Sequence, residues 1–230
     1  MKIKTIILSI ILLVTTLPSN FSQFVEQPNY ALKSHETLEI SKVEITPVKT
    51  VVYMTIENRI EGGNFCADKN IYLIYPDGTR SKLTSSNGIP VCPETYKFKT
   101  IGEKFDFVLT FPPLKQGPEW VDLIEDCTDN CFSFYGVTLD SELNKKIDDA
   151  FVLAEKKEPG KALVIFINLA EANDNKNLGI EGLLYINIIK LARETGNSVI
   201  ANEWYSRLKS SGAPRLPLYI KHLNSQGITY

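Results

Sequence analysis

The spacing of apolar residues changes once along this chain, close to Leu139. In Phe105–Phe111 apolar and polar residues alternate, a period of two that places one apolar face on a β-strand. After Asp140 the apolar residues recur every three or four positions, which is the period of an α-helix. The chain is therefore expected to fold as β structure followed by α-helices.

Segments typical of short strands, separated by turn residues, fill residues 37–139. Thr50–Asn58 is rich in β-branched and aromatic residues and is predicted to be a central strand. A change of phase near Ser41 indicates a bulge, and Pro76–Thr79 predicts a hairpin turn. Ser85–Gly88 is predicted to be a further turn. Roughly seven or eight strands at this spacing favour a β-sandwich.

Residues 1–22 have the layout of a secretory signal peptide. Lys2 and Lys4 precede the apolar run Ile6–Val14, which is shorter than the ~20 residues that span a bilayer. An uncleaved N-terminal anchor is the alternative. Residues 23–36 are expected to form a loose lead-in. The mature protein is expected to be exported, to the periplasm, the cell surface or the medium, with no integral membrane span after cleavage.

Four cysteines lie in the expected mature chain, an even number that favours disulfides in an oxidising compartment. Cys127 and Cys131 flank Thr128–Asn130, a turn that brings two sulfurs within bonding reach. That pairing leaves Cys66 with Cys92, although four cysteines allow three connectivities. A metal site is the alternative, but no C-x-x-C pair is present and no histidine lies near, so no metal is expected.

Several short motifs in the first part resemble an immunoglobulin-like sandwich module found in many exported proteins of the Bacteroidetes. They are Gly88-Ile89-Pro90, Cys92-Pro93-Glu94, Phe111-Pro112-Pro113-Leu114, Ile124-Glu125 and Phe134-Tyr135-Gly136-Val137. The resemblance spans residues 37–139. It implies an accessory or binding module without catalytic residues.

The second part, residues 140–230, is expected to form helical hairpins. Asp140 and Ser141 are good N-cap residues, and Pro159 suits the first turn of the next helix. Further helices are predicted over Leu178–Thr195, Ser198–Ser211 and Leu216–Asn224. Gly196-Asn197, Ala201, Tyr205, Leu208 and Pro214 resemble the second helix of a tetratricopeptide repeat. A plain helical bundle with the same packing of small against large residues is the alternative.

No catalytic constellation stands out, and neither an enzyme activity nor a cofactor is expected. Only His35 and His222 are available as imidazole bases, and no G-x-S-x-G motif is present. Asn173–Glu181 resembles a calcium loop, but its glycine is one place late, so a capped helix–helix link is favoured. With 25 basic and 27 acidic residues the chain has no excess positive charge for nucleic acid. Trp120 and Trp204 are expected to be interior residues rather than ligand platforms.

These features together predict a non-catalytic binding or adaptor protein of the bacterial envelope, whose helices hold a peptide or protein partner. Asn187, Lys190 and Arg193 are the predicted ligand-binding residues, because apolar neighbours occupy the packing positions of their helix. Lys190 and Arg193 are three residues apart, close enough to hold one carboxylate together. The alternatives are an enzyme or accessory subunit of carbohydrate processing, and a structural envelope protein. The sequence leaves the oligomeric state open.

Overall fold

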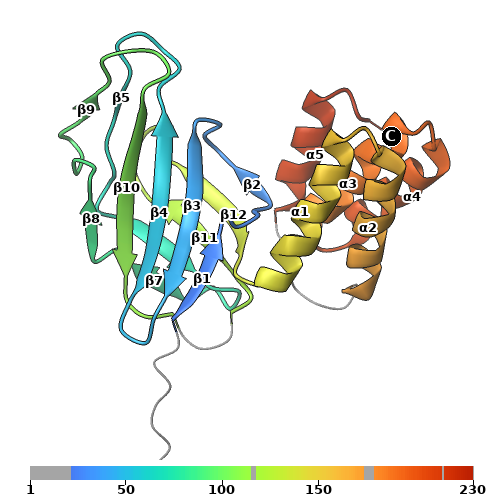
Figure 1. Cartoon of the computed structure of the whole chain (residues 1–230), viewed down its shortest axis with the longest axis horizontal. Helices are drawn as coiled ribbons and strands as arrows, with labels where there is room; N and C mark the ends of the chain where they lie inside the picture. The colour runs from blue at the N-terminus through green and yellow to red at the C-terminus, as the bar shows by residue number, and fades with distance from the viewer. Residues whose placement is uncertain (1–21, 115–117, 174–178, 214, 230) are drawn as a thin grey trace, which may run out of the picture.

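A computed structural model describes residues 22–114, 118–173, 179–213 and 215–229 (Figure 1). Residues 1–21 of the predicted signal peptide and residues 174–178 of the calcium-like segment lie outside this range. The described residues form twelve strands followed by five helices. The predicted order, β structure and then helices, is confirmed.

The first sheet is antiparallel and has the strand order β1-β3-β4-β10-β8. The predicted central strand, β4, lies in its middle, and the pairing of β3 with β4 shifts register between Ile40 and Lys42, which confirms the bulge near Ser41. The strands are β1 (Gln23–Glu26), β3 (Leu38–Ile45), β4 (Thr50–Glu57), β8 (Ser85–Asn87) and β10 (Lys104–Phe111).

The second sheet has the order β2-β12-β11-β6-β7, and its β6–β7 hairpin is the one predicted around Pro76–Thr79. Its strands are β2 (Leu32–Lys33), β6 (Ile71–Ile74), β7 (Arg80–Lys82), β11 (Trp120–Glu125) and β12 (Ser133–Thr138); β5 (Asn64–Phe65) and β9 (Tyr96–Lys97) pair separately. Leu109 of the first sheet and Leu123 of the second belong to one buried cluster. The two sheets therefore form a sandwich.

Three short strands lie where other structure was expected. β1 and β2 occupy the segment predicted to be a loose lead-in, and β8 occupies part of the predicted turn Ser85–Gly88. All three are edge strands, and Val25 of β1 is buried against the sandwich core. Strands of two to four residues leave too short an alternation to detect, and long-range pairing stabilises them.

Two disulfides are present, as predicted. Cys66 bonds to Cys92, with Cα atoms 5.3 Å apart, and Cys127 bonds to Cys131, with Cα atoms 5.6 Å apart. Both belong to loops at the same end of the sandwich, since Cys66, Cys92 and Cys127 border one hollow there. The two bonds tie loops that have little regular structure of their own.

The helices form a second lobe with its own apolar core, which includes Phe166, Ile188 and Trp204. They are α1 (Ser141–Glu155), α2 (Pro159–Ala172), α3 (Glu181–Glu194), α4 (Ser198–Ser210) and α5 (Leu216–Ser225). Asp140 caps α1 as predicted, because its Oδ1 accepts from two backbone N–H groups of the first turn. No helix in the described ranges is long and apolar enough to span a bilayer.

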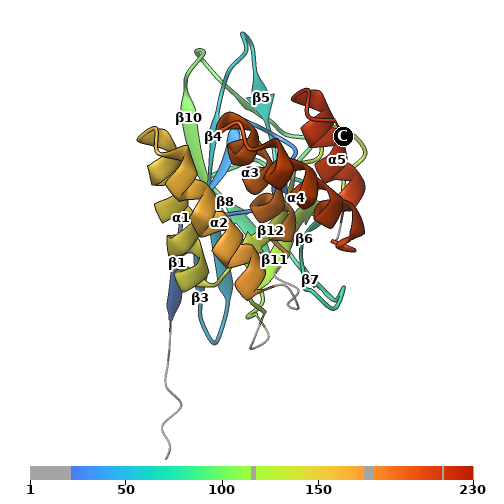
Figure 2. The ribbon, with the colours of Figure 1, turned by 90° about the vertical axis from the view of Figure 1, so that its right-hand side faces the viewer.

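The helical lobe lies against the outer face of the second sheet (Figure 2). On β11, Val121 and Leu123 face the sandwich core, so Trp120 and Asp122 face outward, yet both are buried. Gly179, at φ +65°, packs so closely on the Trp120 ring that a Cβ atom there has no room. Asp122 pairs with Arg215, the residue that precedes α5.

Candidate functional site

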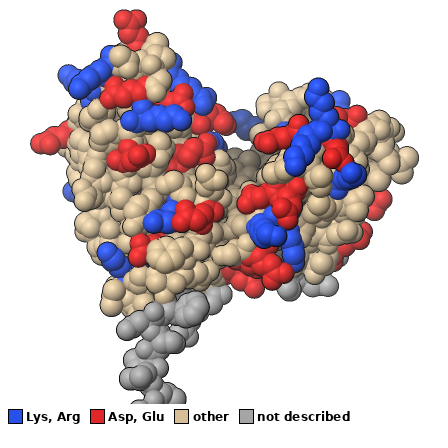
Figure 3. Space-filling model, in the orientation of Figure 1, with Lys and Arg blue, Asp and Glu red and all other residues tan. Residues whose placement is uncertain are grey.

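A cleft of about 590 Å³ lies between the sandwich and the helical lobe. We call it the interlobe cleft. In Figure 3 the surface is hollowed between the two lobes. The sandwich contributes Tyr30, Glu39, Ser41 and Thr55 among others, and the helices contribute Phe151 of α1 and Leu183 of α3. The wall from the helices is thus apolar, and the wall from the sandwich is mostly polar and includes Lys104.

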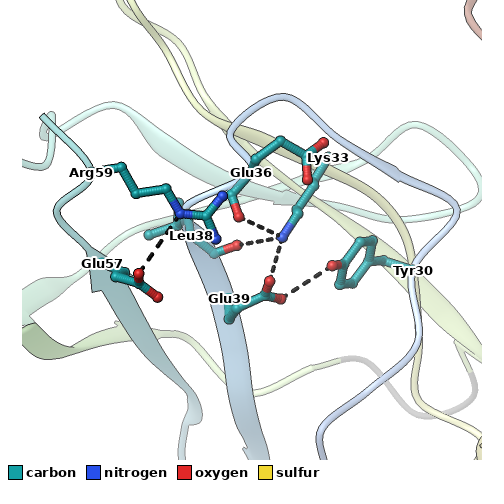
Figure 4. A network of polar contacts seen from close by, with 7 residues as sticks. All are labelled: Tyr30, Lys33, Glu36, Leu38, Glu39, Glu57 and Arg59. Atoms are coloured by element: carbon teal, nitrogen blue, oxygen red, sulfur yellow. Dashed lines mark hydrogen bonds and ion pairs between the residues drawn. The ribbon is translucent and has the colours of Figure 1, made fainter. Parts of the chain in front are cut away.

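The polar wall is held by a network around Lys33 (Figure 4). Its ammonium donates to the carbonyl oxygens of Glu36 and Leu38, both at 3.1 Å, and pairs with the carboxylate of Glu39. These three partners use all three N–H groups of the ammonium. Tyr30 donates its hydroxyl to the other Glu39 oxygen at 3.1 Å. Glu39 therefore faces the cleft from a fixed position.

Burial, together with the charge of Glu39, raises the pKa of Tyr30 well above its usual range. The phenol therefore stays protonated at physiological pH and keeps its hydrogen bond to Glu39. Arg59 and Glu57 also appear in Figure 4, where they pair with each other at 3.8 Å. Their side chains are 58% and 35% exposed, so this pair contributes little to stability.

The link between the lobes runs beside the cleft. The side-chain oxygen of Asn144, on α1, accepts from the backbone N–H of Asn29 at 2.7 Å. The side-chain amide of Asn29 donates to the carboxylate of Asp148 at 2.9 Å. Asn144 also donates to the carbonyl oxygen of Thr138 at 3.1 Å. Phe151 lies on the same face of α1, seven residues after Asn144, and its ring packs on Phe166. The apolar wall is thus anchored to the sandwich and to the helical core.

Two of the predicted ligand residues lie on the face of α3 that borders the cleft. Leu183, Asn187 and Lys190 follow the spacing i, i+4, i+7, which places them along one face of a helix. Asn187 donates its side-chain amide to the Leu183 carbonyl at 2.8 Å, so this donor is already used. Lys190 is half-buried. Of these three residues only Leu183 is among those that line the cleft itself.

Lys190 lies in a small group of charges that both lobes supply. Burial lowers the pKa of His222 on α5, and the charge of Lys190 lowers it further, while Glu36 of the sandwich acts in the opposite direction. These effects need short distances, so residues from α3, α5 and the β2–β3 loop come near one another.

Arg193 follows Lys190 by one turn of α3 and makes a contact of its own. Its Nη1 donates to the carbonyl oxygen of Gly227 at 3.1 Å, close to the C-terminus. It borders a separate depression of about 280 Å³ with Gly196, Ser198 and Thr229. The binding of one carboxylate by Lys190 and Arg193 together stays a prediction.

A second hollow, of about 460 Å³, lies at the disulfide-bonded end of the sandwich. Glu125 is 7% exposed there, and its two oxygens accept from the backbone N–H groups of Asp68 at 2.7 Å and Phe132 at 3.0 Å. Burial raises the pKa of Glu125 even though these two bonds act against it. Because both oxygens hold loop backbone, the carboxylate has a structural role.

The contacts of His35 are also structural. Its Nδ1 lies 2.8 Å from the Ser34 hydroxyl oxygen, and that oxygen accepts from the backbone N–H of Ser133 at 2.8 Å. The pair therefore fixes β2 against β12 rather than exposing a nucleophile. Within the described ranges, no three His, Cys, Asp or Glu side chains gather in a way that holds a metal ion.

Sequence reasoning missed the cleft residues Tyr30, Glu39 and Phe151. Tyr30 lies in the predicted lead-in, and Phe151 has the helical spacing of an ordinary core residue. Phe151 lines the same cleft as Tyr30 and Glu39 only because the two lobes pack together, and no local sequence pattern indicates that packing. Trp120 and Trp204 are 4% and 3% exposed, which agrees with the prediction of interior tryptophans.

Comparisons of the chain with models of known protein families, with curated proteins and with solved structures found no match.

Proposed function

We propose that the chain is an exported, non-catalytic binding protein of the bacterial cell envelope that holds a peptide segment of a partner protein in the interlobe cleft. The observation that carries this proposal is the cleft itself, which has one wall from each lobe. Clefts between packed units are common places for ligands, because both units supply contacts. In this reading the sandwich is an immunoglobulin-like module, and the helical hairpins are tetratricopeptide-like.

The two walls suit the two chemical parts of a peptide. Phe151 and Leu183 offer an apolar surface for one side chain of the ligand. The side-chain oxygens of Gln27, Asn29 and Thr55 offer acceptors, which hydrogen-bond to peptide N–H groups without regard to the ligand's sequence. A peptide is thus anchored by one apolar residue and held in place by its backbone.

Export is part of the proposal and is supported by the two disulfides, which persist in oxidising compartments. The signal-like pattern of residues 1–22 supports the same compartment.

Selection from a phage-displayed library of random peptides, followed by calorimetry on the enriched peptides, tests this function. We expect Phe151→Asp to weaken binding at least tenfold, because a carboxylate replaces the apolar surface of the cleft. Val152→Asp is the matched control, since Val152 is the next residue of α1 and is 43% exposed. Its affinity and its melting temperature should equal those of the unchanged protein. Phe151→Asp should melt at a lower temperature, because the Phe151 ring packs on Phe166, so its affinity is measured at a temperature where circular dichroism shows it folded.

The same titration examines the predicted charged residues one at a time. If Lys190 holds an acidic group of the ligand, Lys190→Glu weakens the binding of such peptides while Arg193→Glu, outside the cleft, does not. Unchanged affinity in folded Phe151→Asp protein would remove the cleft as the binding site. Enrichment of no peptide, together with binding to an array of glycans, would favour the carbohydrate alternative.

A further inference from the structure

The interlobe cleft continues as a groove over the outer face of the first sheet. A hollow of about 430 Å³ lies over β4, β8 and β10, and Asn87, Gly88 and Asp106 are among its lining residues. Ser41 and Thr55 line both this hollow and the interlobe cleft. The two spaces therefore adjoin, and together they form one groove that runs from β8 across the sheet to α1 and α3.

Gly88, directly after β8, allows this strand to lie close to β10 at the edge of the groove. Gly88 has φ +84°, and a Cβ atom there would approach the carbonyl oxygen of Asp106 to 2.9 Å. A glycine is therefore needed at this position for β8 to reach its place at the edge of the sheet. The floor of the groove is thus formed by paired, regular strands.

Hydrogen-bond donors in the middle of the groove are already used. The Ser41 hydroxyl donates to the Tyr53 carbonyl oxygen at 3.2 Å, and the Thr55 hydroxyl donates to Asp106 Oδ1 at 2.5 Å. The Tyr53 hydroxyl donates to Glu44 at 2.9 Å. Each hydroxyl has one proton, so these groups offer a ligand only lone pairs.

Asp106 makes the acceptor character of the groove stronger. Its side chain is exposed, and in the part of the chain that the structure describes no lysine or arginine pairs with it within 4.0 Å. The nearby Lys42 instead lies over the Tyr53 ring, 4.1 Å from its centroid. Lys104, two residues before Asp106 on β10, lines the cleft end of the groove, so the acceptor character belongs to the end at Asp106. A ligand group that pairs with Asp106 must be a hydrogen-bond donor, and a positive charge complements this carboxylate best.

We propose that the segment bound in the interlobe cleft is extended and basic, with an arginine or lysine side chain paired to Asp106. This inference rests on the proposed function and names the ligand class. A guanidinium suits the site, because its fork of N–H groups reaches a carboxylate and neighbouring hydroxyl oxygens at once. The apolar side chain of the same ligand occupies the space beside Phe151 and Leu183.

The strand spacing fixes how far apart these two ligand residues lie. Asp106 lies on β10, and Ser41, at the edge of the cleft, lies on β3, two strands away. Two spacings of ~4.8 Å make about 10 Å, which an extended chain covers in about three residues. The basic residue is therefore at least three positions from the apolar anchor.

The test compares peptide selections on the unchanged protein and on Asp106→Asn. Asparagine keeps the Oδ1 acceptor for Thr55 but removes the charge, so the fold is preserved, which a melting curve checks. Glu94→Gln is the matched control, because Glu94 is an exposed acidic residue that does not line the groove. We expect the unchanged protein and the control to enrich arginine or lysine at a constant spacing from an apolar residue.

The enriched peptide is then resynthesised with glutamine in place of its basic residue. This change should weaken binding about tenfold to the unchanged protein and by less than twofold to Asp106→Asn. Peptides that need Phe151 but show no basic position would overturn this inference and leave the proposed function standing. If no peptide is enriched at all, both fail, and the groove then belongs to another class of ligand.

Discussion

At the scale of single residues, β11 carries two buried carboxylates that are stabilised in different ways. Glu125 holds two backbone N–H groups at the end of the sandwich. Asp122 is 1% exposed, accepts from the backbone N–H of Gly136 at 2.8 Å and pairs with Arg215 of the other lobe. A buried charge without such partners costs several kcal/mol, so each aspartate or glutamate on this strand needs its neighbours.

His222 provides a pH-dependent test at the same scale. Its folded-state pKa lies below 6.5, first because of burial and then because of Lys190, while Glu36 raises it only partly. Between that lowered value and about 6.5 the unfolded chain binds more protons than the folded one. The free energy of unfolding therefore falls as pH is lowered through this window. Above about pH 6.5 the imidazole is neutral in both states and has no such effect.

We expect His222→Gln to flatten this slope in urea unfolding measured from pH 7.5 down to about 5, because glutamine does not titrate. His35→Gln serves as the control, since it removes the other histidine of the chain. An equal slope in the unchanged protein and in His222→Gln would show that the contribution of His222 is absent.

At the scale of elements, long periodic segments were predictable and short paired ones were not. β10 contains the predicted strand Phe105–Phe111, and α1 begins where Asp140 predicts, because periodicity and capping are local properties. β1, β2 and β8 were missed, since strands of two to four residues depend on partners far along the chain. The site was less predictable still, because Tyr30 and Phe151 line the same cleft only when the lobes pack against each other.

The two disulfides give a prediction at this scale. Cys66–Cys92 joins residues 26 apart, and Cys127–Cys131 joins residues four apart. The longer loop loses more entropy in the unfolded chain, so the chain-entropy relation gives about 3.5 kcal/mol for the first bond and about 2 kcal/mol for the second. Replacing each pair by serines should lower the free energy of unfolding in that order.

Urea unfolding of the two double-serine variants measures the difference. An equal loss in both variants would indicate that the folded loops, rather than the unfolded chain, decide the contribution of the bonds. Each pair is replaced as a whole, because a single serine would leave a free thiol in the partner cysteine.

At the scale of the whole molecule, the angle between the lobes decides whether the interlobe cleft exists. Contacts between the lobes hold it, among them Asn29 with Asn144, Trp120 with Gly179, and Asp122 with Arg215. The guanidinium of Arg215 also lies over the Tyr135 ring, 4.2 Å from its centroid. Loss of these contacts would separate the two walls of the cleft without unfolding either core.

Arg215→Met tests this contact most directly. Methionine fills similar space but leaves the Asp122 carboxylate buried without its cation, which we expect to lower the free energy of unfolding by about 3 kcal/mol. Adding Asp122→Asn should recover most of that loss, because the neutral amide keeps an acceptor for Gly136 without a buried charge. Arg193→Met is the control, since this exposed arginine makes one hydrogen bond to a carbonyl and its loss should lower the free energy of unfolding by less than about 1 kcal/mol.

Trp120 fluorescence in a Trp204→Phe background reports the lobe contact, because Trp120 is the other tryptophan of the chain and packs on Gly179. If Arg215→Met is no less stable than Arg193→Met, the ion pair does not hold the lobes, and other contacts such as those of Asn29 and Gly179 must fix the walls of the cleft.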